Sequence, residues 1–106
     1  MRVSALIPTY NRATYLRHSL ESIFRQKRTP DEVIVVDDGS TDNTIHVVRQ
    51  YRDVRYIRQE NCGVAAARNR ALEAATGDVI AWLDSDDLWE TDFLSTVTTW
   101  LEDTTV

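Results

Sequence analysis

The architecture of this chain is set by residues 33–42, VIVVDDGSTD. Four β-branched apolar residues in succession, Val33 to Val36, predict a strand buried on both faces, as in the centre of a parallel sheet. The polar residues that follow are turn and helix-capping types, and they predict an immediate turn into a helix through Ile45, Val48 and Tyr51. A buried strand that leads directly into a helix is the repeating unit of α/β folds.

The same alternation extends over the rest of the chain. Short apolar runs predict strands at 3–7, ending at Pro8, at 54–58, nearer an edge, and at 79–83. Helical spacing predicts helices from Leu16 to Phe24, over 65–75 with Gly77 as the helix-ending residue, and from Trp89 to Leu101. This order predicts an α/β fold, a three-layer α/β/α domain with a mainly parallel four-stranded sheet and right-handed crossovers.

Composition narrows the classes of function. The chain has 106 residues, with 42% hydrophobic and 27% charged, which predicts one globular domain over residues 1–106. A net charge of −5 argues against a nucleic-acid partner. The single cysteine, Cys62, excludes an internal disulfide and fits a reducing compartment. Without an apolar run near the ~18 residues that span a bilayer, we expect a cytoplasmic domain.

Polar residues gather where the predicted strands end. The segments that follow the four strands are residues 8–11, 37–40, 61–63 and 84–87. Parallel strands place their carboxyl ends at one edge of the sheet, where open α/β sheets bind ligands. We therefore expect a ligand site built from these four segments.

The Asp84-Ser85-Asp86-Asp87 segment has two interpretations. Three carboxylates within four residues repel one another unless a cation or solvent relieves them, and Mg²⁺ or Mn²⁺ takes such carboxylates together with substrate phosphates. The alternative is a solvated acidic loop that caps the next helix with Asp86 or Asp87. The residue chemistry alone leaves both open.

The other candidate residues also have an ordinary structural interpretation. Asp37 and Asp38 are candidates to accept hydrogen bonds from a base or ribose, or belong only to a capped turn. Tyr10 is placed to stack on a base beside Thr9 and Asn11, or is a surface tyrosine. Arg68 is a diphosphate ligand or a solvated helix residue.

Taken together, four segments resemble the family 2 glycosyltransferases of the GT-A fold. They are residues 4–11 (SALIPTYN), 35–42 (VVDDGSTD), 63–69 (GVAAARN) and 84–87 (DSDD). They occur in the family's order over nearly the whole chain. The fold that the resemblance implies is the Rossmann-like half of a GT-A fold.

The resemblance also implies a function and a set of site residues. It implies a nucleotide-sugar donor, most often a UDP-sugar, and Mn²⁺ or Mg²⁺ as cofactor, with inversion at the transferred sugar. Donor-binding positions carried over from the family are Pro8, Thr9, Tyr10, Asn11, Asp37, Asp38, Gly63, Arg68, Asn69, Asp84 and Ser85. Within this set, Asp38 would accept from the base and Asp37 would support the turn. Asp86, with Asp84, would hold the metal.

Length is the main departure from the family. Its general base and acceptor site, for a saccharide or lipid-linked acceptor, lie in a second half expected after Leu101. We therefore expect donor binding but no efficient transfer by these 106 residues alone. We also expect self-association, through the exposed sheet edge or through Trp89, Phe93 and Trp100 of the last helix. A smaller departure is Ala71, where the family often has glycine.

Other functions fit less well. Nucleotidyl transfer to sugars usually needs a glycine-rich basic loop after the first strand, and Pro8-Thr9-Tyr10-Asn11 is not one. A receiver-like signalling domain needs a lysine late in the chain, whereas the only lysine is Lys27. A non-catalytic nucleotide-sugar-binding or assembly module stays open, because no general base is identified.

Overall fold

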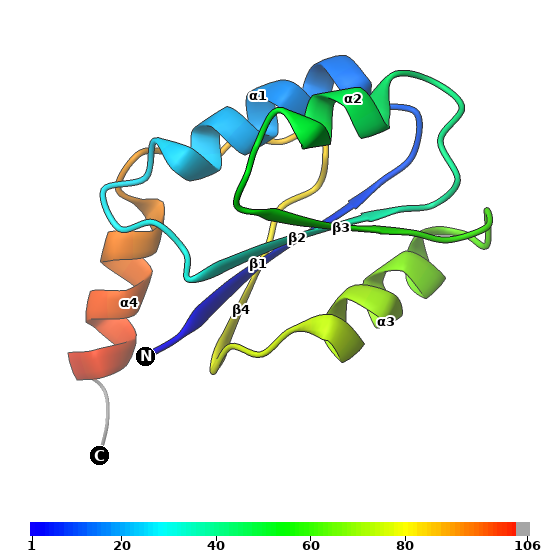
Figure 1. Ribbon diagram of the computed structural model, residues 1–106. Helices are drawn as coiled ribbons and strands as arrows, with labels where there is room; N and C mark the ends of the chain where they lie inside the picture. Colours follow the sequence, from blue (N-terminus) through cyan, green and yellow to red (C-terminus); the bar gives the residue numbers. More distant parts are fainter. Residues whose placement is uncertain (104–106) are drawn as a thin grey trace.

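The centre of the computed structural model, which describes residues 1–103, is a four-stranded sheet (Figure 1). Its strands are β1 (Val3–Thr9), β2 (Glu32–Asp37), β3 (Val54–Arg58) and β4 (Val79–Trp82). They lie in the order β3-β2-β1-β4, and each neighbouring pair is parallel. The predicted α/β class is thus confirmed, β2 is central, and the alternating 54–58 segment is an edge strand.

Helices cover both faces of the sheet. They are α1 (Ala13–Phe24), α2 (Thr44–Arg49), α3 (Val64–Ala74) and α4 (Phe93–Asp103). Figure 1 shows α1 and α2 on one face and α3 on the other. Side chains alternate along β1, so Ala5 and Ile7 pack with α1 and α2, while Leu6 packs against Ala67 and Ala71 of α3. Within residues 1–103, no helix combines the length and apolar character needed to span a bilayer.

The strand order positions the site. The chain leaves β1 toward β2 on one side, and β4 returns on the other side of β1. The connection from β1 through α1 covers one face and the connection from β3 through α3 covers the other, so the starts of α1 and α3 lie on either side of the carboxyl edge. Ligands of open α/β sheets bind in the crevice that forms at such a point.

β1 continues through Pro8, which the sequence had placed at its end. Pro8 pairs in register with Val36 of β2. The carbonyl of Thr9 accepts from the N–H of Asp38 after β2, whereas the carbonyl of Leu6 accepts from the N–H of Leu83 on the β4 side. Backbone groups along β1 alternate between its two neighbours, so the nitrogen of Pro8 points toward β4. The pairing of β1 with β4 already ends at Leu6. The strand therefore needs no hydrogen bond from the proline nitrogen.

The role predicted for Gly77 is also different. α3 ends at Ala74, three residues earlier, and only Gly39 and Gly63 among the described glycines have a positive φ. A Cβ atom at Gly77 would lie 2.4 Å from Ser4 Oγ and 2.8 Å from Ser4 N. Glycine is needed here because β1 passes closely, not because a helix ends.

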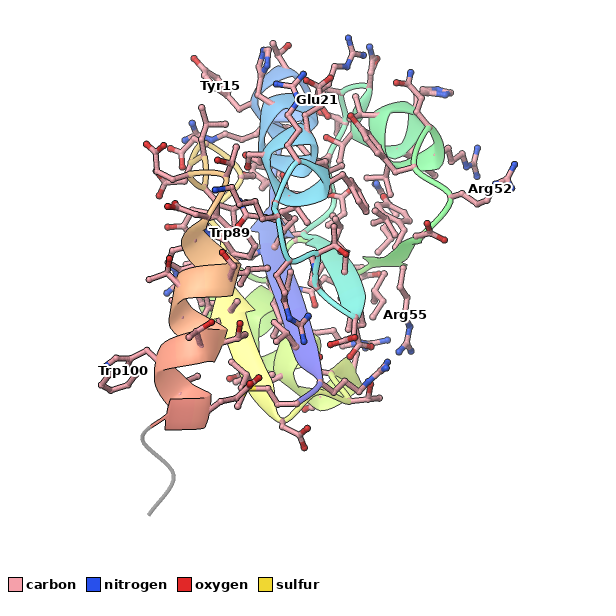
Figure 2. All side chains as sticks on the ribbon, turned by 90° about the vertical axis from the view of Figure 1, so that its left-hand side faces the viewer. Tyr15, Glu21, Arg52, Arg55, Trp89 and Trp100 are labelled. Atoms are coloured by element: carbon pink, nitrogen blue, oxygen red, sulfur yellow. The ribbon has the colours of Figure 1, made fainter. Side chains whose placement is uncertain are left out.

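The last helix begins at Phe93, four residues later than predicted, and Asp86 and Asp87 do not cap it. Its buried residues are Leu94 and Thr98. Phe93 and Trp100 are 38% and 63% exposed, and Trp100 points away from the domain in Figure 2. The helix starts late because residues 89–91 bond to α1 and to the segment after it.

Candidate functional site

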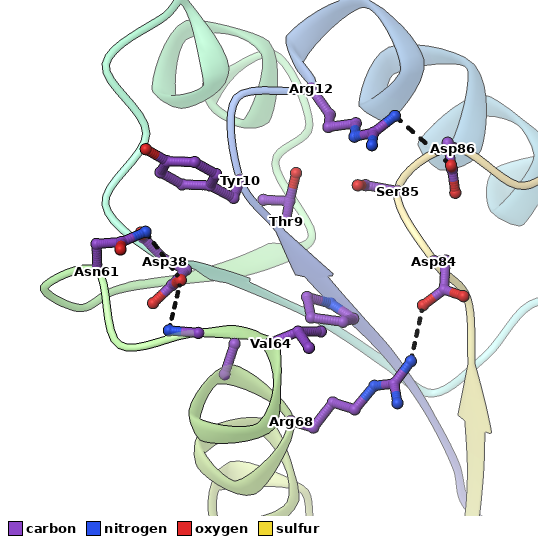
Figure 3. A pocket seen from close by; sticks show the side chains of 13 residues that line it. Thr9, Tyr10, Arg12, Asp38, Asn61, Val64, Arg68, Asp84, Ser85 and Asp86 are labelled. Carbon is purple, nitrogen blue, oxygen red and sulfur yellow. Dashed lines mark hydrogen bonds and ion pairs between the residues drawn. The ribbon is translucent and has the colours of Figure 1, made fainter.

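A pocket of about 520 Å³ lies at the carboxyl edge of the sheet (Figure 3). This volume is in the range of about 300–1,000 Å³ that is usual for small-molecule sites. Segments after β1, β2, β3 and β4 all contribute, as the sequence predicted. The lining residues are Pro8, Thr9, Tyr10, Arg12, Asp38, Asn61, Gly63, Val64, Ala67, Arg68, Asp84, Ser85 and Asp86.

The end of β1 supplies an unsatisfied hydroxyl and an aromatic ring. Thr9 is 4% exposed, and its Oγ1 is the one buried side-chain polar atom without a hydrogen-bond partner among the side chains described, residues 1–102. A buried hydroxyl of this kind is unfavourable unless a ligand or a water molecule forms a hydrogen bond with it. Tyr10 is 46% exposed beside it and lines the same pocket. The pair offers one specific hydrogen bond next to an available ring face.

Asp38 fixes the loop that leads into α3. Its carboxylate accepts hydrogen bonds from Gln59 Nε2 (2.9 Å), Asn61 Nδ2 (3.2 Å) and the backbone N–H groups of Cys62 (2.8 Å) and Gly63 (3.0 Å). Burial by itself would raise the pKa of Asp38, but the hydrogen bonds from Cys62, Gln59 and Gly63 outweigh it and lower this pKa. Four bonds fill the acceptor capacity of the carboxylate. The base contact predicted for Asp38 would therefore have to replace one of them.

The acidic loop after β4 is paired with two arginines. Asp84 Oδ1 lies 3.2 Å from Arg68 Nη2 of α3, and Asp86 Oδ2 lies 3.6 Å from Arg12 Nη1, just before α1. Arg68 also lies over the Trp82 ring, 5.9 Å from its centroid. Residues 84–87 form a turn, closed by the Asp87 N–H on the Asp84 carbonyl, rather than a continuation of β4. Both carboxylates nevertheless reach the same pocket.

Three polar side chains on and after α1 hold this loop by its backbone. Ser19 Oγ lies 2.6 Å from the Asp87 carbonyl and 3.1 Å from the Ser85 carbonyl. Ser22 Oγ accepts from the Trp89 N–H, and the Gln26 amide bonds the Glu90 carbonyl and the Leu94 N–H. Helical spacing did not predict this anchor. The sequence feature that indicates it is a serine on the apolar face of a helix. Ser19 is as buried as Leu16 and Ile23, so its hydroxyl needs a hydrogen-bond partner.

Three of the predicted donor-binding residues lie outside this pocket. Asp37 is buried on the opposite side of β2, where it accepts from Tyr56 Oη, Arg58 and the Ser40 N–H. Asn11, at φ 50°, joins two loops by accepting from the Thr41 N–H. Asn69 lines a neighbouring groove beside Trp82. The carboxylate of Asp37 is held by these partners on β3 and in the following turn, and one step along α3 turns Asn69 from the side that carries Arg68.

Two charged or polar lining residues were absent from the predicted set. Arg12 follows Asn11 directly, and extending the segment after β1 by one residue would have included it. Asn61 begins the segment after β3, but it was not given a role. Its amide reaches both the carbonyl and the carboxylate of Asp38, so it helps to shape the pocket wall.

The donor set fits a divalent cation that is completed by phosphate. The described residues hold no group of three or more His, Cys, Asp or Glu side chains arranged for a metal. Mg²⁺ and Mn²⁺, however, commonly use one or two protein carboxylates and take their other oxygens from water and phosphate. Asp84 and Asp86, each about half exposed on one loop of the pocket, meet that requirement.

Comparison with known families agrees with this geometry. The sequence model for glycosyl transferase family 2 matches residues 4–106. The chain belongs to this family. Family membership confirms the resemblance, which rested on four short segments.

The related proteins are longer glycosyltransferases, and the chain matches a part of each. The uncharacterized glycosyltransferase YibD of Escherichia coli is 38% identical over 107 residues, which cover 96% of this chain and 31% of YibD. Among solved structures, TarS of S. aureus in complex with UDP has a TM-score of 0.91 and 33% identity, covering 97% of this chain and 32% of the TarS chain.

A second solved structure contains a metal. The mannosyltransferase PcManGT of Pyrobaculum calidifontis, in complex with GDP-Man and Mn²⁺, has a TM-score of 0.88 and 38% identity. The match covers 99% of this chain and 33% of PcManGT. The chain therefore spans about a third of these proteins, and its fold is that of the Rossmann-like part of a GT-A glycosyltransferase.

Proposed function

We propose that this chain is the donor-binding part of a family 2 glycosyltransferase. It binds a nucleotide-diphosphate sugar, a UDP-sugar by preference, together with a divalent cation. The observation that carries the proposal is the single pocket that joins Thr9, Tyr10, Arg68, Asp84 and Asp86 from three separate segments. The relatives add support, since TarS was solved with UDP and PcManGT with GDP-Man and Mn²⁺.

Each wall of the pocket has a part in binding. The Tyr10 ring stacks on the base, and the unpaired Thr9 hydroxyl forms a hydrogen bond to it, which satisfies a buried polar atom. Asp38 keeps Gly63 and the start of α3 in place, where the positive end of the helix dipole favours an anionic ligand. Arg68 neutralises the diphosphate.

Asp84 and Asp86 would hold the cation, Mn²⁺ or Mg²⁺, beside the diphosphate. When bound, it stabilises the negative charge that develops on the leaving nucleoside diphosphate as an acceptor hydroxyl attacks the anomeric carbon. The backbone anchors from Ser19, Ser22 and Gln26 fix the loop that carries both carboxylates. A ligand set held in this way is pre-organised before the donor arrives.

We assign no general base within this chain. Asp38 is saturated with hydrogen bonds, and Asp84 and Asp86 are the proposed cation ligands. We therefore propose that these 106 residues bind the donor without efficient transfer to a saccharide or lipid-linked acceptor. The same observation favours, as a second candidate, a non-catalytic nucleotide-sugar-binding or assembly module. Supplying the remaining part of a longer relative in trans distinguishes the two, because only the enzyme part then gains transfer activity.

Calorimetric titration of UDP, with and without Mn²⁺, tests the proposal. Wild type should bind UDP more tightly with Mn²⁺, and Asp86→Ala should lose that gain, about tenfold or more in affinity. Asp92→Ala is the matched control, because Asp92 is an exposed acid farther along the same connection and does not line the pocket. A folded wild-type chain that binds no UDP, or an Asp86→Ala variant that retains the Mn²⁺ effect, would contradict the proposal.

A further inference from the structure

Each proposed cation ligand already has a counter-ion. Asp84 is paired with Arg68 and Asp86 with Arg12, and Figure 3 shows the two pairs at opposite ends of the segment 84–86. The arginines come from different layers of the domain, Arg68 from α3 and Arg12 from the start of α1. A cation that binds Asp86 therefore competes with the Arg12 guanidinium for that carboxylate.

Breaking the Arg12–Asp86 pair costs little free energy. The side chains of Arg12 and Asp86 are 48% and 51% exposed, and their closest atoms are 3.6 Å apart. Exposed ion pairs of this kind are weak, and breaking one lowers the affinity of a competing ligand by no more than about fivefold. The pair can hold the loop carboxylate in the ligand-free pocket and still give way to a cation.

A released Arg12 guanidinium stays in the pocket. Arg12 lines the same cavity as Arg68, and its planar fork of N–H donors matches phosphate oxygens. The charges of a divalent cation and a diphosphate largely cancel. Exchanging one Arg–Asp pair for a cation–Asp and an Arg–phosphate contact therefore leaves the pocket close to its ligand-free charge.

We propose that Arg12 binds the donor diphosphate and that its ion pair with Asp86 couples cation binding to nucleotide binding. This inference rests on the proposed donor-binding function. A cation alone competes with Arg12 for Asp86, and a diphosphate alone competes with Asp86 for Arg12. When both are present, neither competition remains, so each ligand strengthens the binding of the other.

The Arg12→Gln variant tests this coupling, because the two ligands should respond in opposite directions. Mn²⁺ alone, followed by electron paramagnetic resonance, should bind roughly two- to fivefold more tightly. UDP in saturating Mn²⁺, followed by calorimetry, should bind about tenfold more weakly. Arg25→Gln is the matched control, because Arg25 forms a similar exposed pair with Glu21 at 3.5 Å on α1, outside this pocket. It should change neither affinity.

Arg12→Lys separates charge from geometry. It should bind Mn²⁺ like wild type, because the charge that competes for Asp86 is retained, and bind UDP with an affinity between those of wild type and Arg12→Gln. Mn²⁺ binding by Arg12→Gln no tighter than by wild type, UDP binding that is unchanged, or equal effects of Arg25→Gln would overturn the coupling. If wild type binds UDP with Mn²⁺ in the same series, such results leave the proposed function standing. If a folded wild type does not bind it, the proposed function itself is wrong.

Discussion

Asp38 is the residue on which the pocket wall most depends. Its carboxylate holds the 61–63 loop through four hydrogen bonds, including two backbone N–H donors, while only 5% of the residue is exposed. Hydrogen bonds from backbone N–H groups to a buried carboxylate favour its charged form. The residue therefore links the stability of the domain to the shape of the site.

Replacing Asp38 with Asn should lower both stability and affinity. Asn offers the two N–H donors fewer acceptor sites, so the free energy of unfolding should fall by about 2 kcal/mol in urea denaturation. Affinity for UDP should also fall, because fewer hydrogen bonds then hold the 61–63 loop in place. Asp42→Asn is the control, since Asp42 also accepts from two backbone N–H groups but does not line the pocket. It should lower stability alone, and equal losses of UDP affinity would contradict the account.

The lowered pKa of Asp38 also fixes the direction of its pH dependence. Because the pKa is below its ordinary value of 3.8, the folded state releases the proton more readily than the unfolded state. Its contribution to stability is complete above pH 3.8 and is lost as the pH falls through the folded-state pKa. Asp38→Asn should therefore show a smaller loss of stability over this acid range than wild type.

The sequence predicts which segments meet at the pocket, because strand ends determine that, but it does not show which side chains of those segments line the pocket. Pro8 and Thr9 end β1, Tyr10 and Asp84 lie just after β1 and β4, and the parallel topology brings all four to one edge. Asp37 also ends a strand, but its carboxylate accepts from Tyr56 and from the Ser40 N–H, so it supports the turn after β2 instead of lining the pocket. The contacts of a side chain such as Asp37 depend on the residues that neighbouring strands and loops bring close to it, and the local sequence does not show these.

At the level of elements, α1 positions the acidic loop. The loop carries charged, exposed side chains that pack little, yet its backbone is tied at Ser85, Asp87, Glu90 and Leu94. The same bonds explain why α4 starts later than helical spacing predicted. Periodicity identifies the apolar face of a helix, but not the polar residues on that face that bind a distant backbone.

Removing one anchor should weaken the site without touching a ligand. Ser19→Ala deletes the hydroxyl shared by the Asp87 and Ser85 carbonyls and should reduce the Mn²⁺-dependent part of UDP binding several-fold. Binding of UDP without Mn²⁺ should change little, which a general loss of folding would not produce. Ser95→Ala, which deletes a similar bond to the Asp92 carbonyl on α4, should change neither. Calorimetry of both variants at two Mn²⁺ concentrations measures this difference.

At the scale of the whole molecule, apolar side chains are exposed along one edge of the sheet. β4 is an edge strand, and Trp82, Leu72 and Val64 beside it are 38%, 47% and 59% exposed. Open strand edges and exposed apolar groups both promote pairing with another chain. We propose that the isolated chain self-associates through this edge.

Sedimentation velocity over a range of concentrations measures this self-association. Leu72→Lys should shift the distribution toward monomer, because it places a charge beside β4. Leu88→Lys is the matched control, since Leu88 is 64% exposed but lies in the loop after β4, against a different groove. A wild-type chain that remains monomeric at high concentration would contradict the proposal, and so would equal effects of the two lysines.

We propose that a nucleotide binds with a divalent cation at the carboxyl edge between β1 and β4. Amide NMR spectra of the chain, recorded with UDP and then with UDP and Mn²⁺, test it most directly. UDP should shift the resonances of Thr9, Tyr10 and Gly63, and Mn²⁺ should selectively broaden residues 84–86. Asp31 and Asp78, at the opposite edge of the sheet, should be unaffected. Changes centred on that opposite edge, or none at all in a folded chain, would contradict the account.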